Sequence, residues 1–301
     1  MDKLLVILGP HASGKSDLAI KIAQLFNGEI ISADSRQIYQ GMNIGTGKVL
    51  QDDNKNLEFL SSGIRHHLLD IVSPQEYFSV AQYQKLALDA ISDILQRGKL
   101  PIICGGTGLY ISATIEGWQL PKIKPQEILR QELENLTTQE LFQKLQQLAP
   151  ERAQTIDQNN KRRLVRALEI ILSGQTIAPL KKRPLTYDIF IIGIKRNNEE
   201  LKQRIKLRLE QRLTQGMIEE IKKLKINGVS SRRLEDFGLE YRWVNRYLEN
   251  KIDFETMKNN LYHDICQYAK RQMTWFKKIP NVHWVSNENE VIDLTHQFLA
   301  N

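Results

Sequence analysis

The sequence has little cysteine and no long apolar run, and both absences narrow the class of protein. Its two cysteines, Cys104 and Cys266, lie far apart and form no C-x-x-C pair, so we expect reduced thiols and no zinc site. No apolar run approaches the length of a membrane-spanning helix. The first apolar run starts at residue 4, which leaves no room for a signal or transit peptide. We therefore expect a cytoplasmic protein that makes no membrane contact.

Acidic residues are fewer than basic ones. The 301 residues include 35 Asp and Glu against 42 Lys and Arg, for a formal net charge of +7. Hydrophobic and charged contents of 41% and 26% are ordinary for a globular chain. The basic excess favours a polyanionic partner.

A complete phosphate-loop motif, G-x-x-x-x-G-K-[ST], lies near the N-terminus. An apolar run at 4–8 precedes it and a helix-like stretch at 15–26 follows, which is the context that the motif requires. Its backbone amides and the start of the helix suit a polyphosphate, Lys15 can reach the outer phosphate, and Ser16 can ligate Mg²⁺. The eight residues are Gly9, Pro10, His11, Ala12, Ser13, Gly14, Lys15 and Ser16.

A second motif of nucleotide hydrolases is missing. The apolar strand expected at 100–104 runs into Gly105-Gly106-Thr107-Gly108, with no carboxylate at its end to hold Mg²⁺. An acid instead follows the strand expected at 29–33, at Asp34, where ligands bind in open parallel sheets. The pattern favours a small-substrate transferase over a motor or pump.

The order of elements predicts the fold class and the domains. Strands at 4–8, 29–33 and 100–104 alternate with helices at 15–26 and 79–97, which indicates an α/β protein with a parallel sheet flanked by helices. Residues 41–66 are polar and predict a loop. A Leu- and Gln-rich helical segment at 118–188 predicts a small helical insertion domain, and 189–194 predicts a return to the sheet. We assign 1–117 and 189–301 to the core domain, with a helical C-terminal part.

Two helices and a histidine pair have open interpretations. In the helix expected at 199–226, Arg204, Arg208 and Arg212 recur every fourth residue. They can form a solvated face of the helix, or their guanidinium groups can bind phosphate. The helix expected at 254–278 mixes basic and aromatic residues, which suits a core helix or nucleic acid. His66 and His67 lack a third ligand at useful spacing, and a structural role is favoured.

Several segments together make the chain similar to the tRNA dimethylallyltransferase family, and they occur in the family's order over nearly the whole chain. Besides the phosphate loop they are Asp34-Ser35-x-Gln37-x-Tyr39, 42–46, 66–70, 105–110, Arg162-Arg163 to Glu169, and 269–276.

The resemblance implies a P-loop NTPase-like core with a helical insertion that contacts the tRNA anticodon stem-loop. It implies transfer of a dimethylallyl group from dimethylallyl diphosphate to N6 of the adenosine 3′ to the anticodon (position 37), in tRNAs that read codons starting with U. Residues 9–16 would bind the donor diphosphate, with Mg²⁺ on Ser16. Asp34 would be the general base, with Thr107 and Arg208 catalytic and Arg204 an alternative to Arg208. The tRNA contacts implied are Asp34, Ser35, Arg36, Gln37, Arg162, Arg163, Arg166, Lys270, Arg271 and Gln272.

The sequence departs from the family pattern in four places. In the phosphate loop, His11 replaces the threonine that is common in the family. The chain has Gly47-Lys48-Val49 where the family usually has Ala-Lys-Pro. Residues 156–160 and 238–242 also differ from the family pattern. These changes concern tRNA contacts more than the chemistry. Three other functions stay open: prenylation of free AMP, ADP or ATP, a small-molecule kinase, and a non-catalytic RNA-binding protein. We expect a monomer.

Overall fold

The chain consists of two compact units, Met1–Gly117 with Pro184–Asn301, and Trp118–Arg183. The computed structural model describes residues 1–52, 58–121, 126–174, 181–183 and 185–300. The inserted unit starts where the sequence predicts but ends at Arg183 and not at 188. The reason is that residues 185–187 lead directly into the sheet strand that starts at Asp188. Each unit is described by itself.

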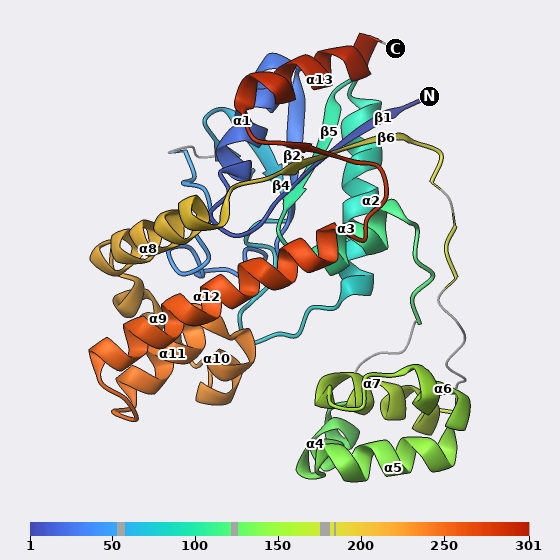
Figure 1. The fold of residues 1–301 in the computed structure, drawn as a ribbon, viewed down its shortest axis with the longest axis vertical. Helices are drawn as coiled ribbons and strands as arrows, with labels where there is room; N and C mark the ends of the chain where they lie inside the picture. Colours follow the sequence, from blue (N-terminus) through green and yellow to red (C-terminus); the bar gives the residue numbers. More distant parts are fainter. Residues whose placement is uncertain (53–57, 122–125, 175–180, 184, 301) are drawn as a thin grey trace. The chain divides into compact units, whose positions relative to one another are not determined.

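The large unit is built on a seven-stranded sheet in the order β3-β4-β2-β5-β1-β6-β7 (Figure 1). Its pairs are parallel except β3 with β4. The central strands are continuous apolar runs because helices cover both faces. The strands are β1 (Lys3–Leu8), β2 (Gly28–Ala33), β3 (Leu60–Ser61), β4 (Ile64–His67), β5 (Leu100–Gly105), β6 (Asp188–Ile194) and β7 (Val282–Val285).

Alternate residues of β1 point into two different cores. Leu4, Val6 and Leu8 pack with α2 (Val80–Gln96) and α3 (Gly108–Ile115), whereas Leu5 and Ile7 pack with α1 (Lys15–Leu25) and α13 (Glu288–Ala300). This alternation follows from the two-residue repeat of a strand. It fixes α1, and with it the phosphate loop, on the sheet.

The helical C-terminal part forms a third core. It contains α8 (Asn198–Thr214), α9 (Met217–Ile226), α10 (Ser231–Phe237), α11 (Leu239–Leu248) and α12 (Phe254–Phe276). The apolar stripe of α8 packs on α12, with Leu201, Ile205 and Leu209 in the same buried cluster as Leu261 and Ile265.

Two expectations from the sequence are wrong here. The single helix predicted at 199–226 is two helices, because Gly216 takes a left-handed conformation (φ +97°) between α8 and α9. The loop predicted at 41–66 contains β3 and the start of β4, which are too short to give a clear alternating pattern. Among the helices of the described residues, none is both long and apolar enough to cross a bilayer.

The inserted unit is a four-helix cluster of α4 (Glu127–Asn135), α5 (Thr138–Leu148), α6 (Pro150–Thr155) and α7 (Lys161–Leu172). Leu141, Leu145, Leu164 and Leu168 lie in its buried core. Its two ends meet in an antiparallel bridge between Trp118 and Lys182. Parts of the predicted insertion, 122–125 and 175–180, lie outside the described residues.

Candidate active site

The phosphate loop joins β1 to α1 at the carboxyl edge of the sheet. Gly14 takes φ +90° at the start of α1, which a residue with a side chain adopts only under strain. A Cβ on Gly9 would lie 2.7 Å from Ser13 Oγ, so the loop is tightly closed. Lys15 and Ser16 line a cavity of about 590 Å³ at the first turn of α1. Burial lowers the pKa of Lys15 from its ordinary value. The geometry suits an anion seated on the amides at the start of α1.

Three loops meet at this edge because β2, β5 and β1 are neighbours in the sheet. The phosphate loop follows β1, Asp34 follows β2, and Thr107 follows β5. Thr107 donates its N–H to Ala33 O at 3.0 Å, and its Oγ1 accepts the N–H of Ser35 at 3.0 Å. The structure therefore brings Asp34 and Thr107, both predicted catalytic residues, to adjoining loops.

The carboxylate of Asp34 is anchored by its own turn. Its Oδ1 accepts the backbone N–H of Arg36 at 2.8 Å and that of Gln37 at 3.4 Å. The side chain is neither fully buried nor fully exposed. An anchored carboxylate that is not fully buried can act as a proton acceptor.

The glycines after β5 explain why no carboxylate stands there. A Cβ on Gly105 would lie 2.2 Å from Ala33 O, and one on Gly108 would lie 2.4 Å from Trp275 Cδ1. At Gly105 and Gly108 the chain passes so close to β2 and α12 that no side chain fits. Thr107 is the one residue of this turn that can present a polar side chain.

Arginines line the entrance of the phosphate-loop cavity. Arg204 Nε donates to Ala12 O at 2.8 Å, and Arg208 Nη2 donates to Gly47 O at 3.2 Å. Both side chains line the cavity with Lys15 and Ser16. Burial first, and then nearby Arg212, lowers the pKa of Arg208 to about 10. Arg204 and Arg208 thus lie at the phosphate-loop cavity, whereas Arg212 is paired with Glu240.

Gln272 is placed differently from its predicted role as a tRNA contact. It is 6% exposed, and both ends of its amide bind within the protein. Its Oε1 accepts the N–H of His11 at 2.8 Å, and its Nε2 donates to Gly106 O at 2.7 Å. The sequence does not separate Gln272 from Lys270 and Arg271, which precede it directly on α12. In the structure those two residues are exposed, whereas Gln272 lies on the buried face of the helix.

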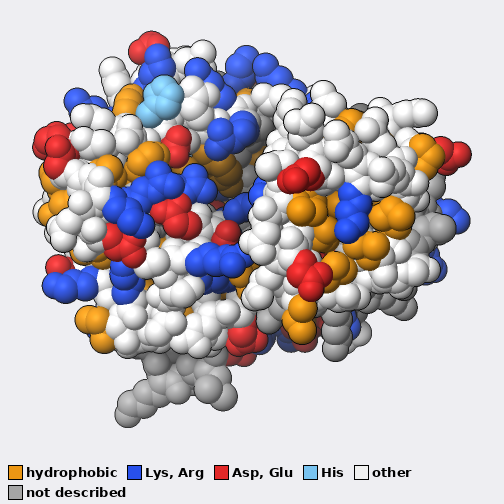
Figure 2. All heavy atoms as spheres, turned by 90° about the horizontal axis from the view of Figure 1, so that it is seen from below, with side chains coloured by type: hydrophobic (Ala, Val, Ile, Leu, Met, Phe, Trp, Pro, Cys, Tyr) orange, Lys and Arg blue, Asp and Glu red, His pale blue; other side chains and the backbone are white. Residues whose placement is uncertain are grey.

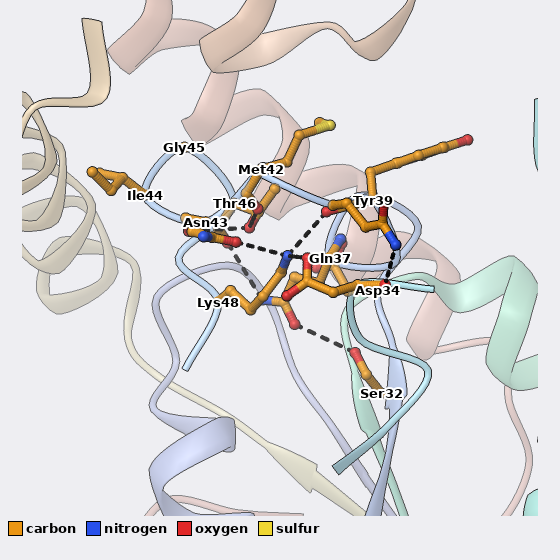
Figure 3. Close-up of polar contacts among 12 residues, drawn as sticks. Ser32, Asp34, Gln37, Tyr39, Met42, Asn43, Ile44, Gly45, Thr46 and Lys48 are labelled. Carbon is orange, nitrogen blue, oxygen red and sulfur yellow. Dashed lines mark hydrogen bonds and ion pairs between the residues drawn. The ribbon is translucent and has the colours of Figure 1, made fainter. Parts of the chain in front are cut away.

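The residues after Asp34 are largely engaged in the fold. Gln37 accepts from Ser32 Oγ at 3.3 Å and donates to Thr46 O and Gly47 O, each at 3.4 Å (Figure 3). Arg36 donates to Asp236 O at 3.2 Å, and its guanidinium lies over the Phe237 ring. These contacts hold the Asp34 turn against its neighbours.

Lys48 holds the loop that carries Gly47. Figure 3 shows its ammonium group between Asn43 and the backbone of Tyr39. It donates to Tyr39 O at 3.0 Å and to Asn43 Oδ1 at 2.9 Å, and it pairs with Asp70. Burial lowers the pKa of Lys48, against the opposing effect of Asp70. The same loop gives three successive N–H groups, from 43 to 45, to the Glu220 carboxylate.

Two residues of the site were not predicted from the sequence. One is Tyr268 of α12, whose pKa is raised by burial and then by the Asp34 charge. The other is Arg196, two residues after the end of β6, which donates to Ser13 O at 3.3 Å. The sequence position of Arg196 could have indicated this contact. Because β6 adjoins β1 in the sheet, a basic residue near the carboxyl end of β6 must come near the phosphate loop, which follows β1.

His66 and His67 have the structural role that the sequence favours. His67 Nε2 lies 2.8 Å from Glu29 Oε2, and His66 Nδ1 lies 3.0 Å from Ile64 O. Among the described residues, no group of three His, Cys, Asp or Glu side chains can hold a metal ion.

The basic residues of α7 lie on the inserted unit. Arg162 and Arg163 are exposed, whereas Arg166 pairs with the buried carboxylate of Glu169, which also binds Arg130.

On the face drawn in Figure 2, Lys and Arg side chains lie in groups beside Asp and Glu. The net charge of +7 is therefore not one continuous patch on that face.

The model of the IPP transferase family matches residues 37–279. The chain belongs to this family. The matched span begins after the phosphate loop, so the loop motif and the family match are independent observations.

Relatives match nearly the whole chain. The tRNA dimethylallyltransferase of Anoxybacillus flavithermus is 40% identical over 296 residues, which is 97% of this chain and 92% of the relative. The tRNA dimethylallyltransferase 2 of Shewanella sediminis is 38% identical and covers 99% and 97% of the two chains.

Solved structures agree in fold. The tRNA isopentenylpyrophosphate transferase of Bacillus halodurans superposes with a TM-score of 0.72 at 36% identity, covering 100% of this chain and 96% of that one. A eukaryotic dimethylallyltransferase acting on tRNA superposes with a TM-score of 0.79 at 26% identity, covering 100% and 80%. The P-loop-like α/β fold expected from the sequence is confirmed.

Proposed function

We propose that the protein transfers a dimethylallyl group from dimethylallyl diphosphate to N6 of adenosine 37 in tRNAs that read codons starting with U, working in the cytoplasm as a monomer. One observation carries the proposal: in a chain of this family, the phosphate loop lies beside the loops that hold Asp34 and Thr107. A diphosphate site and a proton acceptor are the two groups that prenylation of an amine requires.

The reaction breaks the C1–O bond of the donor and forms a C1–N6 bond. Negative charge grows on the departing diphosphate, where the loop amides, Lys15 and Arg208 stabilise it. Asp34 accepts the proton that N6 loses. Mg²⁺ held by the Ser16 hydroxyl would neutralise further phosphate charge when bound. Thr107, whose hydroxyl accepts the N–H of Ser35, supports the acceptor side.

The assay offers labelled dimethylallyl diphosphate and Mg²⁺ with an unmodified anticodon stem-loop, and separately with AMP. We expect prenylated RNA and inert AMP. Prenylated AMP with inert RNA would instead indicate a free-nucleotide prenyltransferase. Transfer of label from γ-labelled ATP to a nucleoside would indicate a kinase.

The variant Asp34→Asn separates chemistry from binding. An amide oxygen still accepts the N–H of Arg36, so the turn is kept while the base is lost. We expect prenyl transfer to fall by about 10² or more, with stem-loop affinity retained. The control is Asp89→Asn, at an exposed carboxylate paired with Lys85 on α2. Equal activity of the two variants would remove Asp34 from the mechanism.

A further inference from the structure

Arg212 is a buried cation with a fixed partner. It lies on α8 one turn after Arg208 and is 4% exposed. Its Nη1 donates to Glu240 Oε1 at 2.9 Å and to Gly45 O at 3.2 Å. A buried charge is tolerated only with such partners. The guanidinium is thus held in one orientation by α11 and by the loop at 43–48.

One nitrogen of the Arg212 guanidinium group makes no hydrogen bond to the described residues. Arg212 Nη2 is buried and has no hydrogen-bond partner among the residues that the structure describes. Leaving a charged donor unsatisfied is costly. An unpaired donor on an otherwise fixed arginine points to a ligand.

Gly47 brings this nitrogen together with Arg208. A Cβ on Gly47 would lie 2.0 Å from Arg212 Nη2 and 2.5 Å from Arg208 Nη2. Both guanidinium groups therefore meet over the bare Cα of Gly47. An alanine there, the residue usual in the family pattern, has no space in this arrangement.

Two like charges this close repel each other, and an anion bound between them would relieve the repulsion. Arg212 acts on Arg208 as a repelling charge, and it also disfavours the protonated form of His11 in the phosphate loop. Arg208 and Arg212 both line a cavity of about 580 Å³. That cavity shares Gly47, Lys48, Val49 and Arg208 with the one that contains Lys15 and Ser16. The two cavities are therefore neighbours, with Arg208 in the lining of both.

We propose that Arg212 is a donor-binding residue whose Nη2, together with Arg208, binds the diphosphate, and that Gly47 lacks a side chain to admit both guanidinium groups. Paired guanidinium groups match phosphate oxygens in geometry and charge. The inference rests on the proposed function only for the identity of the molecule that carries the diphosphate.

Calorimetric titration of the full chain with inorganic diphosphate and Mg²⁺ tests the inference without prenyl transfer. The double variant Arg212→Met with Glu240→Gln removes both buried charges and leaves no unpaired carboxylate. If Arg212 only balances Glu240, this variant binds diphosphate like the wild type, which overturns the proposal. We expect a folded protein whose Kd is weaker by about tenfold or more. If the double variant does not fold, Arg212→Lys tests the proposal instead. This variant keeps a positive charge beside Glu240 but removes the forked donor of arginine. Wild-type affinity of Arg212→Lys for diphosphate would overturn the proposal.

A glycine pair gives a matched control. Gly47→Ala and Gly98→Ala place a methyl group at similar backbone angles (φ +60° and +68°), but a Cβ on Gly98 meets nothing within 4 Å. We expect weaker diphosphate binding only for Gly47→Ala, and equal binding by both variants contradicts the role of Gly47. Wild-type diphosphate binding without prenyl transfer would reject the proposed function and leave this inference standing.

Discussion

Gln272 joins His11 of the phosphate loop to the turn after β5. Its amide oxygen accepts the His11 N–H at 2.8 Å while its amide nitrogen donates to Gly106 O at 2.7 Å. One side chain of α12 thus fixes the distance between the loop suited to diphosphate and the turn that carries Thr107.

Replacing Gln272 is expected to affect the donor site and not RNA binding. Gln272→Ala leaves a buried N–H and a buried carbonyl without partners, at a cost of about 1–3 kcal/mol in the free energy of unfolding. We expect the KM for dimethylallyl diphosphate to rise while stem-loop affinity stays within twofold. Gln267→Ala, on the same helix but bonded only to exposed His263, is the control. A loss of RNA affinity specific to Gln272→Ala would restore its predicted tRNA contact.

The predicted RNA contacts can be tested through salt. Each Lys or Arg that neutralises a phosphate contributes about 0.7–0.9 to the slope of log K against log salt. Alanine at Arg162, Arg163, Lys270 or Arg271 should therefore lower the slope by about one each. We expect a smaller change for Arg166, which is committed to Glu169. Stem-loop affinities between 50 and 200 mM salt measure this, and a flat plot for the wild type would contradict an electrostatic contact.

Glu29 predicts a pH dependence of stability. Burial alone raises its pKa, but hydrogen bonds from Arg97, Lys99 and His67 outweigh burial and lower the pKa far below the ordinary 4.5. Because the folded pKa is depressed, this contribution is present above pH 4.5 and is lost as pH falls toward the folded value. Glu29→Gln should lower the free energy of unfolding by about 2–3 kcal/mol at pH 7. Denaturant titrations of both proteins should differ less below pH 4.5; a difference independent of pH would contradict the ion-pair origin.

The two cysteines should react differently. Burial raises the pKa of Cys104 to about 12, and its Sγ lies 3.5 Å from Lys15 O beneath the phosphate loop. Cys266 is partly exposed. Iodoacetamide at pH 8 should therefore add one group to the folded protein, at Cys266, and two after denaturation, as measured by intact mass. Modification of folded Cys104 would show that the β5 edge opens in solution.

Local patterns were sufficient for the phosphate loop and for four strands of the sheet, β1, β2, β5 and β6. The strand before Gly9, the strand before Asp34 and the return strand at 189–194 all have the continuous apolar runs of buried parallel strands. Their neighbours in the sheet, and hence the meeting of Asp34 with Thr107, follow from parallel topology.

Contacts between distant residues were beyond such patterns. The burial of Gln272 depends on which face of α12 meets Gly106, and the pair of Arg212 with Glu240 joins positions 28 residues apart. The break at Gly216 was missed because the apolar repeat continues into α9. These features depend on packing, which a periodic pattern does not specify.

The Trp118–Lys182 bridge closes the inserted segment at its base. A segment that leaves and rejoins the chain at one place can be exchanged, shortened or enlarged without changing how α3 is connected to β6. The helices between Trp118 and Lys182 can therefore change in number or length while the two ends of the segment stay paired at the same place.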